Sequence, residues 1–218
     1  MTREMGVLIE AFNIPIKRSD IATLCDGQWL NDEVINFYFN LLMQRQTDFP
    51  ETHAKVHCFN TFFYSKLRKD GYGSIKRWTR KVDIFAVDYI LIPVHLSLHW
   101  CCAAINLKGK RIEYYDSLHG DNKQCLQLLR DYLKSEYKDK KGGQLDLSEW
   151  RDHSPKNIPG QENGFDCGVF TSTFANYISL ERTFDFGQRD MKYLRKRMIY
   201  EILTKKLLTM NSTKSSSL

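Results

Sequence analysis

The chain has 218 residues, of which 42% are apolar, 27% charged and 13% aromatic, a composition typical of a folded globular domain rather than a disordered segment. Its 32 Lys and Arg against 26 Asp and Glu give a net charge of +6, which favours an acidic partner (nucleic acid, membrane face or acidic protein) without choosing among them. No apolar run approaches the roughly 18 residues of a membrane helix. Residues 1–10 lack the basic and apolar blocks of a signal peptide, so we expect a soluble protein that is not secreted.

No internal repeat and no linker rich in Pro and Gly divides the sequence. We therefore expect a single domain over 1–210, followed by a flexible polar tail over 211–218. The six cysteines contain no C-x-x-C pair, and a chain of this length does not need disulfides for stability. We expect all six to be reduced thiols in a cytosolic or nuclear setting, most of them buried as small apolar residues.

Helical signals come first along the chain. Residues 31–45 place apolar side chains at helical spacing directly after Asn31 and Asp32, either of which can cap a helix. A second helix is expected over 60–69, and it should stop at Gly71.

Strand patterns follow, over 89–94, 98–107 and 111–116. The last two are separated by Lys108-Gly109, which predicts a hairpin with a two-residue turn. Helices are then expected over 121–134, 166–178 and 189–208, with a polar surface loop over 139–160 that carries Trp150. This order of helices, a small sheet and helices again predicts the α+β class.

The densest functional signal is Gln-Glu-Asn-Gly-Phe-Asp-Cys-Gly over 161–168. Asp166 is a good helix N-cap, so Cys167 should stand at a helix N-terminus, where free N–H groups and the helix dipole favour a thiolate. Gly168 allows another segment or a substrate to approach closely. The alternative is that Cys167 is only a small buried apolar residue.

A nucleophilic thiol needs a base and a group that orients the base. If Lys108-Gly109 is a two-residue turn, His99 lies opposite Leu118, and Asp116 is its diagonal neighbour on the same face. Diagonal neighbours lie roughly 7–8 Å apart at the backbone, within reach of a His–Asp hydrogen bond. A register shifted by one residue would put the two on opposite faces. Alternatively, His99 is structural and Asp116 forms a turn.

Gln161 lies six residues before the thiol. Its side-chain amide could act with the backbone N–H of Cys167 to donate hydrogen bonds to a tetrahedral oxyanion. Loss of one such donor typically raises the barrier by about 2.7–4 kcal/mol.

Several motifs occur together in a recognisable order: Trp-Leu-Asn-Asp over 29–32, Lys-Arg-Trp over 76–78, Val-His-Leu over 94–96, His99-Trp100, Tyr-Asp-Ser over 115–117, the 161–168 segment, and Arg-Lys-Arg-Met over 195–198. With them the chain resembles the SUMO-specific (sentrin-specific) cysteine proteases, a branch of the papain-like peptidases. The resemblance implies a papain-like α+β fold with a small mixed or antiparallel sheet flanked by helices. It also implies His99 as general base, Asp116 as its orienting group, Cys167 as nucleophile and Gln161 as oxyanion donor.

The resemblance further implies a set of substrate contacts. Trp29 and Trp100 would clamp the C-terminal Gly-Gly of the substrate in a tunnel too narrow for any side chain, although each Trp could instead be core packing. The body of the ubiquitin-like modifier would lie near Asp32, Phe62, Arg77 and His95. Phe165 stands where relatives often carry a small polar residue, which could reshape the leaving-group side of the cleft.

We therefore expect an isopeptidase and endopeptidase that cleaves after the Gly-Gly of SUMO, removing SUMO from target lysines and possibly trimming SUMO precursors. No metal or cofactor, no nucleic acid and no membrane is called for. We expect a monomer in the nucleus or cytoplasm, with the nucleus and nuclear envelope implied by the family alone.

Three alternatives stay open from the sequence. One is a protease for another ubiquitin-like modifier such as NEDD8, and a second is an inert domain that only binds a modifier. The third takes the basic stretches 66–81 and 195–197 as nucleic-acid contacts, although such runs are usually solvated faces.

Overall fold

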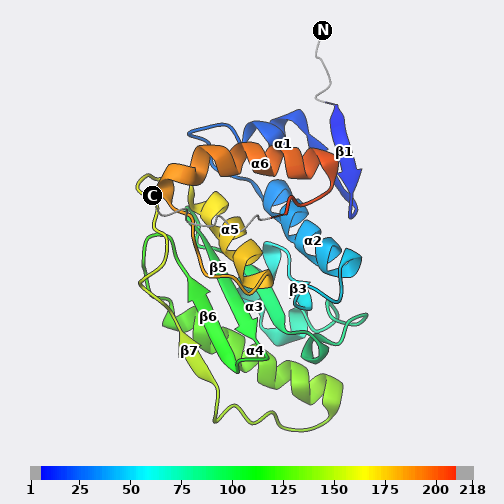
Figure 1. Cartoon of the computed structure of the whole chain (residues 1–218). Coiled ribbons are helices and arrows are strands. Elements are labelled where there is room, and N and C mark those ends of the chain that lie inside the picture. Colours follow the sequence, from blue (N-terminus) through cyan, green and yellow to red (C-terminus); the bar gives the residue numbers. More distant parts are fainter. Residues whose placement is uncertain (1–5, 210–218) are drawn as a thin grey trace.

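A five-stranded mixed sheet forms the centre of the computed structural model, which describes residues 6–209 (Figure 1). Its strand order is β3-β4-β5-β6-β7. These strands span Val56–Cys58, Tyr89–His95, Trp100–Asn106, Arg111–Tyr115 and Arg151–His153. The three central strands are antiparallel, while β3 and β7 are added in parallel at the two edges.

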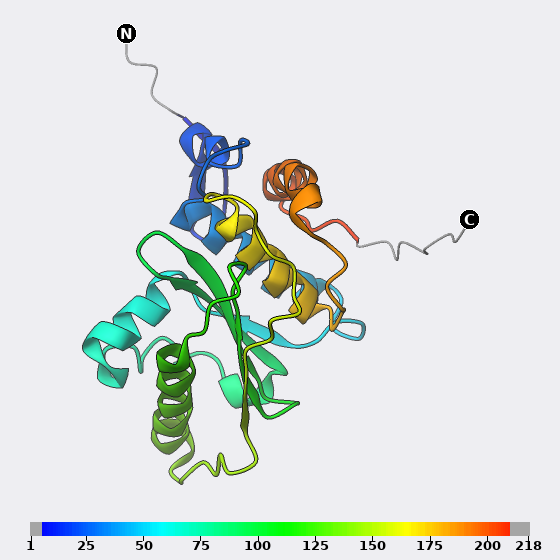
Figure 2. The same cartoon turned by 90° about the vertical axis from the view of Figure 1, so that its left-hand side faces the viewer.

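The helices cover both faces of this sheet (Figure 2). They are α1 (Arg18–Ala22), α2 (Asp32–Asp48), α3 (Phe62–Asp70), α4 (Lys123–Lys141), α5 (Cys167–Ser179) and α6 (Met191–Thr204). On one face, α5 packs on the central strands and α2 packs beside it on β3, with α6 outside both; α3 and α4 cover the other face. Side chains alternate along β5, so that Cys102 enters the core on the α5 side and Cys101 the core on the α3 and α4 side. The α+β class is confirmed.

The predicted hairpin register is confirmed. Cα partners run from Asn106↔Arg111 to Cys102↔Tyr115, as a two-residue turn at Lys108-Gly109 requires. Because β4 and β5 are buried on both faces, they appear in the sequence as nearly continuous apolar runs rather than alternating ones.

The predicted end of one helix and the predicted start of the loop after it are wrong. Helix α4 continues to Lys141, where Gly142 adopts the left-handed conformation (φ 74°) that ends the helix and three lysines occupy the last turn. The predicted loop over 139–160 therefore begins later, and it contains the short strand β7 directly after Trp150. Strand β7 is exposed along its whole length, so no apolar alternation announces it.

Four further elements were not predicted from the sequence: β1 (Val7–Ala11), β2 (Ile14–Lys17), α1 and β3. The β1–β2 hairpin turns at Phe12 and Asn13, both with positive φ. Asn tolerates that conformation, but Phe is not a turn residue, so the usual hairpin signal is missing. In the last helical region, a short 3-10 turn over Gln188–Asp190 precedes α6, which ends earlier than predicted at Thr204.

All six cysteines are free thiols, and only Cys25 is exposed, as expected for a reduced protein. Among residues 6–209, no helix is both long and apolar enough to cross a membrane. The predicted tail over 211–218 lies outside the described residues.

Candidate active site

The residues His99 and Asp116 meet at one end of the sheet, in the geometry that the hairpin register predicts. His99 directly precedes β5, Asp116 directly follows β6, and His99 Nε2 lies 2.6 Å from Asp116 Oδ1. Since a carboxylate only accepts hydrogen bonds, Nε2 carries the shared proton. The other ring nitrogen, Nδ1, can then accept a proton.

Two backbone N–H groups hold the Asp116 carboxylate in place. Leu118 N donates to Oδ1 at 2.8 Å and Gly120 N donates to Oδ2 at 3.1 Å. Burial alone would raise the pKa of Asp116, but these bonds and the one from His99 outweigh burial and lower it. A Cβ on Gly120 would lie only 2.5 Å from Asp116 Oδ2, so this close approach requires glycine.

The electrostatics favour a charged imidazole. Burial lowers the pKa of His99, but Asp116 together with the thiols of Cys101 and Cys167 beside the ring raises it well above its usual value of 6.5. The ring is therefore able to hold a proton taken from a neighbouring thiol.

Cys167 is the first residue of α5 and is only 2% exposed. Asp166 occupies the N-cap position, but the prediction that its side chain caps the helix is wrong, because its carboxylate is turned to other partners. The N–H groups of the first turn thus receive no side-chain cap from Asp166 and remain available near the thiol. Gly168 permits close packing, as expected: a Cβ there would lie 2.9 Å from Leu30 Cβ.

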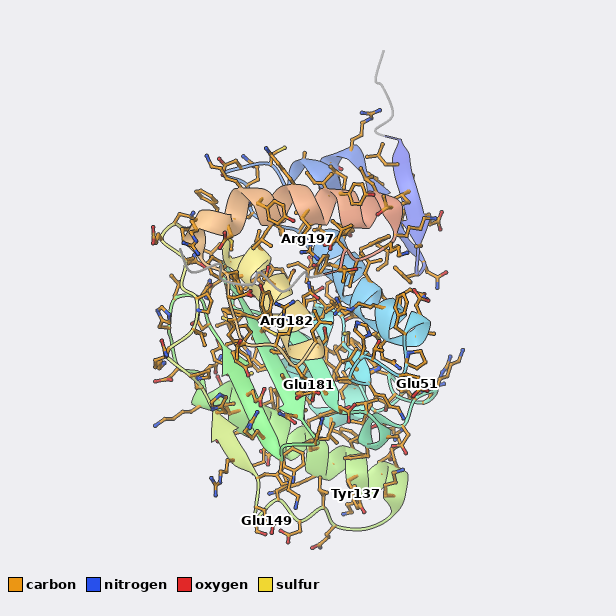
Figure 3. The ribbon with its side chains drawn as sticks, in the orientation of Figure 1. Glu51, Tyr137, Glu149, Glu181, Arg182 and Arg197 are labelled. Carbon is orange, nitrogen blue, oxygen red and sulfur yellow. The ribbon has the colours of Figure 1, made fainter. Side chains whose placement is uncertain are left out.

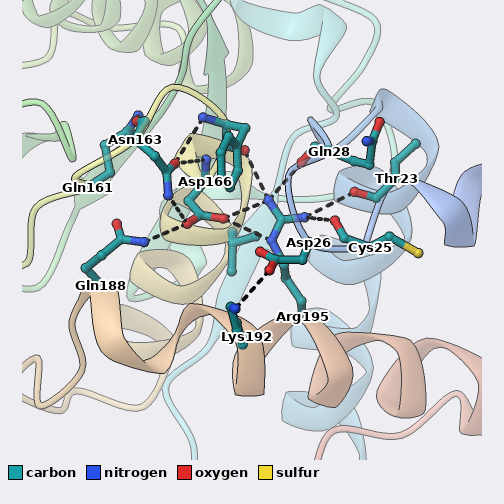
Figure 4. Close-up of polar contacts among 12 residues, drawn as sticks. Thr23, Cys25, Asp26, Gln28, Gln161, Asn163, Asp166, Gln188, Lys192 and Arg195 are labelled. Atoms are coloured by element: carbon teal, nitrogen blue, oxygen red, sulfur yellow. Dashed lines mark hydrogen bonds and ion pairs between the residues drawn. The ribbon is translucent and has the colours of Figure 1, made fainter.

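A buried arginine, Arg195 of α6, connects the residue before the nucleophile to the backbone over 23–28 (Figure 4). Its Nε and Nη2 donate to Asp166 Oδ1 at 2.9 and 2.7 Å, and Nη2 also donates to the backbone oxygen of Gln28 at 2.8 Å. Nη1 donates to the backbone oxygens of Thr23 and Cys25. One guanidinium therefore joins the turn before Cys167 to the segment that leads to Trp29.

The second oxygen of Asp166 is also fully used. Asn163 Nδ2 and Gln188 Nε2 donate to Oδ2 at 2.7 and 2.8 Å. The Phe165 ring is half-buried, with its centroid 5.8 Å from the guanidinium carbon of Arg195. Phe165 is thus partly committed to packing beside the nucleophile.

Gln161 is held by both ends of its side-chain amide. Ser117 Oγ donates to Oε1 at 2.7 Å, and Nε2 donates to the backbone oxygen of Asn163 at 2.5 Å. Its backbone N also donates to the oxygen of Ser117 at 2.8 Å. Since Nε2 has two hydrogens, this arrangement orients the amide and leaves one N–H for a ligand.

The two tryptophans differ in exposure. Trp29 is 45% exposed, whereas Trp100 is 5% exposed and belongs to the core on the α5 side. Trp100 stacks on His95, its cross-strand partner, with ring centroids 4.2 Å apart. Trp29 is therefore accessible to a substrate over much of its surface, while Trp100 is almost entirely buried.

The remaining expected contacts lie at element starts and in a turn. Asp32 and Phe62 open α2 and α3, and Phe62 is 56% exposed; Arg77 is exposed in the segment over 71–81. That segment is tied to α4 by the buried Glu136, which accepts hydrogen bonds from Tyr72 Oη at 2.8 Å and from Thr79 Oγ1.

The basic stretch over 195–197 does not form the exposed surface that the nucleic-acid alternative requires. Arg195 is buried in the network described above. Arg197 is also a residue of α6, and its side chain, only 9% exposed, donates to Glu201 Oε1 and to the backbone oxygen of Leu208 (Figure 3). Of this basic run, Lys196 alone is exposed. The run is not a solvated charge cluster that could contact phosphates.

Sequence reasoning missed several residues of the site. Cys101 lies directly opposite Asp116 when the confirmed register is continued by one pair, so the same register argument could have found it. Arg195 and Glu136 had no such signal, because each sits in a charged helical run and is buried only by tertiary packing.

A sequence model described as "Ulp1 protease family, C-terminal catalytic domain" matches residues 28–207. This chain belongs to the Ulp1 protease family. The matched region includes His99, Asp116, Gln161 and Cys167.

Curated relatives and solved structures agree with this family. A sentrin-specific protease of Caenorhabditis elegans is 50% identical over 200 residues, which cover 92% of this chain and 29% of the relative. Human sentrin-specific protease 2 is 44% identical over 204 residues, covering 93% of this chain and 34% of the relative. The chain thus spans about a third of the length of these relatives.

A solved structure, the C-terminal Ulp1 protease domain in complex with Smt3, the yeast ortholog of SUMO, is 31% identical to this chain. It superposes with a TM-score of 0.81 over 93% of this chain and 89% of that one. Another structure of the same protein is described as the SUMO protease Ulp1 with its catalytic cysteine oxidised to a sulfinic acid. Ulp1 therefore works with a cysteine nucleophile on the same fold.

Proposed function

We propose that this Ulp1-family domain is a cysteine protease that hydrolyses the bond after the C-terminal Gly-Gly of SUMO, in isopeptide conjugates with target lysines and in SUMO precursors. The observation that carries the proposal is the 2.6 Å hydrogen bond between His99 and Asp116, with the Cys167 thiol beside the same imidazole. The names of the relatives, and the Smt3 complex of Ulp1, supply the substrate class.

The first step activates the nucleophile. With Nε2 bonded to Asp116, Nδ1 of His99 takes the proton of the Cys167 thiol, and the free N–H groups at the start of α5 stabilise the resulting thiolate. The thiolate then attacks the carbonyl carbon of the terminal glycine. Asp116 keeps the imidazole oriented and stabilises its positive charge.

The second step is collapse of the tetrahedral intermediate. The Gln161 amide and the backbone N–H of Cys167 donate to its oxyanion. His99 gives its proton to the departing lysine amine, which leaves a thioester between glycine and Cys167. A water molecule that His99 deprotonates then hydrolyses the thioester and frees both SUMO and the enzyme.

Substrate recognition follows from the exposed residues around this centre. Trp29 and Trp100 would enclose the Gly-Gly segment, since glycine alone has no side chain to exclude. Asp32, Phe62, Arg77 and His95 would contact the folded body of SUMO.

The test is cleavage of a purified SUMO conjugate and of a SUMO precursor by the wild-type domain and by Cys167→Ala. We expect the wild type to cleave the conjugate and the variant to leave it intact. Intact activity in Cys167→Ala would overturn the assignment.

Parallel assays with SUMO and NEDD8 reporters measure the modifier preference. We expect faster cleavage of the SUMO reporter, because the two curated relatives described above are named for sentrin. Faster cleavage of the NEDD8 reporter would show that NEDD8, and not SUMO, is the preferred substrate of the same reaction.

A further inference from the structure

The site contains a third potential ligand beside His99 and Asp116, the thiol of Cys101. Cys101 is the second residue of β5 and is fully buried, opposite the end of β6 that carries Asp116. The hydrolytic steps proposed above give this thiol no role. Its neighbour Cys102 is equally buried but faces the opposite core.

The three side chains form a compact and chemically mixed set. One ligand atom each from His99, Cys101 and Asp116 can be chosen so that all three lie within 4.8 Å of one another, and within residues 6–209 no other group of His, Cys, Asp and Glu meets this condition. Around a tetrahedral Zn²⁺ with bonds of about 2.0–2.3 Å, ligand atoms lie roughly 3.3–3.6 Å apart. Small side-chain adjustments therefore suffice to close the set around one ion.

The donor types indicate which cation would bind. Thiolate, imidazole and carboxylate together suit Zn²⁺ and similar borderline ions, whereas Mg²⁺ and Ca²⁺ prefer oxygen ligands alone. Cys101 and Asp116 are both buried, so a cation held between them would be largely shielded from solvent.

We propose that His99, Cys101 and Asp116 form an inhibitory site for Zn²⁺ that does not require the catalytic thiol. The inhibition rests on the proposed protease function, while the binding site itself does not. When the cation binds, the Cys101 thiol releases its proton to solvent and its sulfur becomes a ligand. Asp116 exchanges its hydrogen bond with His99 for a bond to the cation.

Inhibition follows from the tautomer of His99. When Nε2 binds the cation, the proton that Nε2 shared with Asp116 moves to Nδ1, because a neutral imidazole bound through Nε2 carries its one proton there. Nδ1 is the nitrogen that must accept the proton of Cys167, so the base is blocked although the cation does not touch the thiol. The enzyme is inactive until the cation is removed by a chelator.

The main competing arrangement is a cation that bridges Cys167 and His99 alone. The two arrangements are separated by removing the catalytic thiol. In Cys167→Ala, we expect Co²⁺, used as a spectroscopic substitute for Zn²⁺, to give a thiolate-to-metal charge-transfer band, and calorimetry to detect one Zn²⁺ per chain.

The double variant Cys167→Ala, Cys101→Ser should lose the Co²⁺ band and bind Zn²⁺ at least about tenfold more weakly, since even indirect ligand partners are worth that much. The matched control is Cys167→Ala, Cys102→Ser, which changes an equally buried adjacent thiol on the other face and should keep the band. Circular dichroism of each variant checks that it is folded, and Cys101→Ala provides a second replacement if Cys101→Ser does not fold.

In the presence of Cys167, each protein is compared with itself with and without Zn²⁺. Cys101→Ser should need at least about tenfold more Zn²⁺ for half-inhibition of SUMO cleavage than the wild type. A Co²⁺ band that is absent in Cys167→Ala would overturn the proposal and assign the cation to Cys167. A band that persists in Cys167→Ala, Cys101→Ser would also overturn it, because the thiolate ligand would then be a different cysteine. The titration of Cys167→Ala needs no activity, so its outcome is independent of the SUMO assignment.

Discussion

The site has two halves that are held together in different ways. His99 and Asp116 meet because two adjacent strands of one hairpin bring them together, within a short stretch of chain. Asp166 and Arg195 meet because the start of α5 and the middle of α6 pack against the loop over 23–28. The register of two neighbouring strands places the base and its orienting group in the first half. In the second half, packing between distant segments positions the thiol and Trp29.

The largest effect on the hairpin half is expected from Asp116→Asn. An amide can present its NH₂ group to His99 and stabilise the wrong tautomer, and comparable changes in other triads lower kcat by about 10⁴-fold. We expect a loss of this order in kcat for a SUMO reporter, with little change in KM. A loss below tenfold would show that Asp116 does not orient the base.

The same variant gives a pH signature in stability. Because the folded-state pKa of Asp116 is lowered, its stabilising contribution is present above the usual aspartate pKa of 3.8 and is lost as the pH falls through the lower folded-state value. The difference in free energy of unfolding between wild type and Asp116→Asn should therefore shrink below about pH 4. Urea denaturation from pH 3 to pH 7 measures it, and a difference that grows on acidification would contradict the account.

The packing half should fail through stability. Arg195→Met leaves the buried Asp166 carboxylate without its ion pair, at a cost of about 3–5 kcal/mol in the free energy of unfolding. Arg189→Met is the matched control, since its side chain is 88% exposed, and should change stability by no more than about 0.5 kcal/mol. Equal effects of the two variants in chemical denaturation would remove the central role given to Arg195.

A smaller effect is expected from Gly120→Ala. The added Cβ must displace Asp116 Oδ2, from which it would lie 2.5 Å away, and a shift of about 1 Å in a positioning group can cost about 10²-fold in rate. We expect kcat to fall by about 10- to 100-fold with KM unchanged. Gly143→Ala is the control, because its nearest neighbour would lie at an ordinary 3.7 Å.

The smallest effect should come from Glu136→Gln, which weakens the tether of the segment that carries Arg77. The expected result is a KM for SUMO raised by about three- to tenfold with kcat unchanged, equivalent to about 0.7–1.4 kcal/mol. This is smaller than the roughly 1.5–3 kcal/mol of a hydrogen bond to a charged group, because Gln keeps a weaker, neutral bond in its place. Asp131→Asn, at an exposed position of the same helix where the carboxylate accepts hydrogen bonds from Gln127, should leave KM unchanged. A fall in kcat with KM unchanged would contradict this, because Glu136 would then affect the chemical step and not substrate binding.

These two halves also mark what could be predicted from the sequence. The His99–Asp116 pair follows from one turn and the two-residue period of strands, so counting from Lys108-Gly109 is enough. Cys167 at a helix start follows from the turn residues before it. Arg195 could not be found in this way, because nothing local distinguishes a buried arginine from the exposed Lys196 beside it.

The N-terminal region shows the same limit. Strands β1 and β2 are short, and their turn contains Phe12 at φ 58°, a residue that local preference would not place there. The hairpin forms because Ile16 and its neighbours reach the core on the α5 side. Tertiary burial thus overrides a weak local signal.

The most direct test of the central claim, that Cys167 is the activated nucleophile, is covalent capture by SUMO carrying a C-terminal electrophile, followed by peptide mapping. Cys25 is an internal control, because it is the exposed thiol of the six while Cys167 is buried. The account predicts one adduct per chain, on Cys167 and not on Cys25, and its loss in His99→Ala. An adduct on Cys25, or none at all, would contradict it.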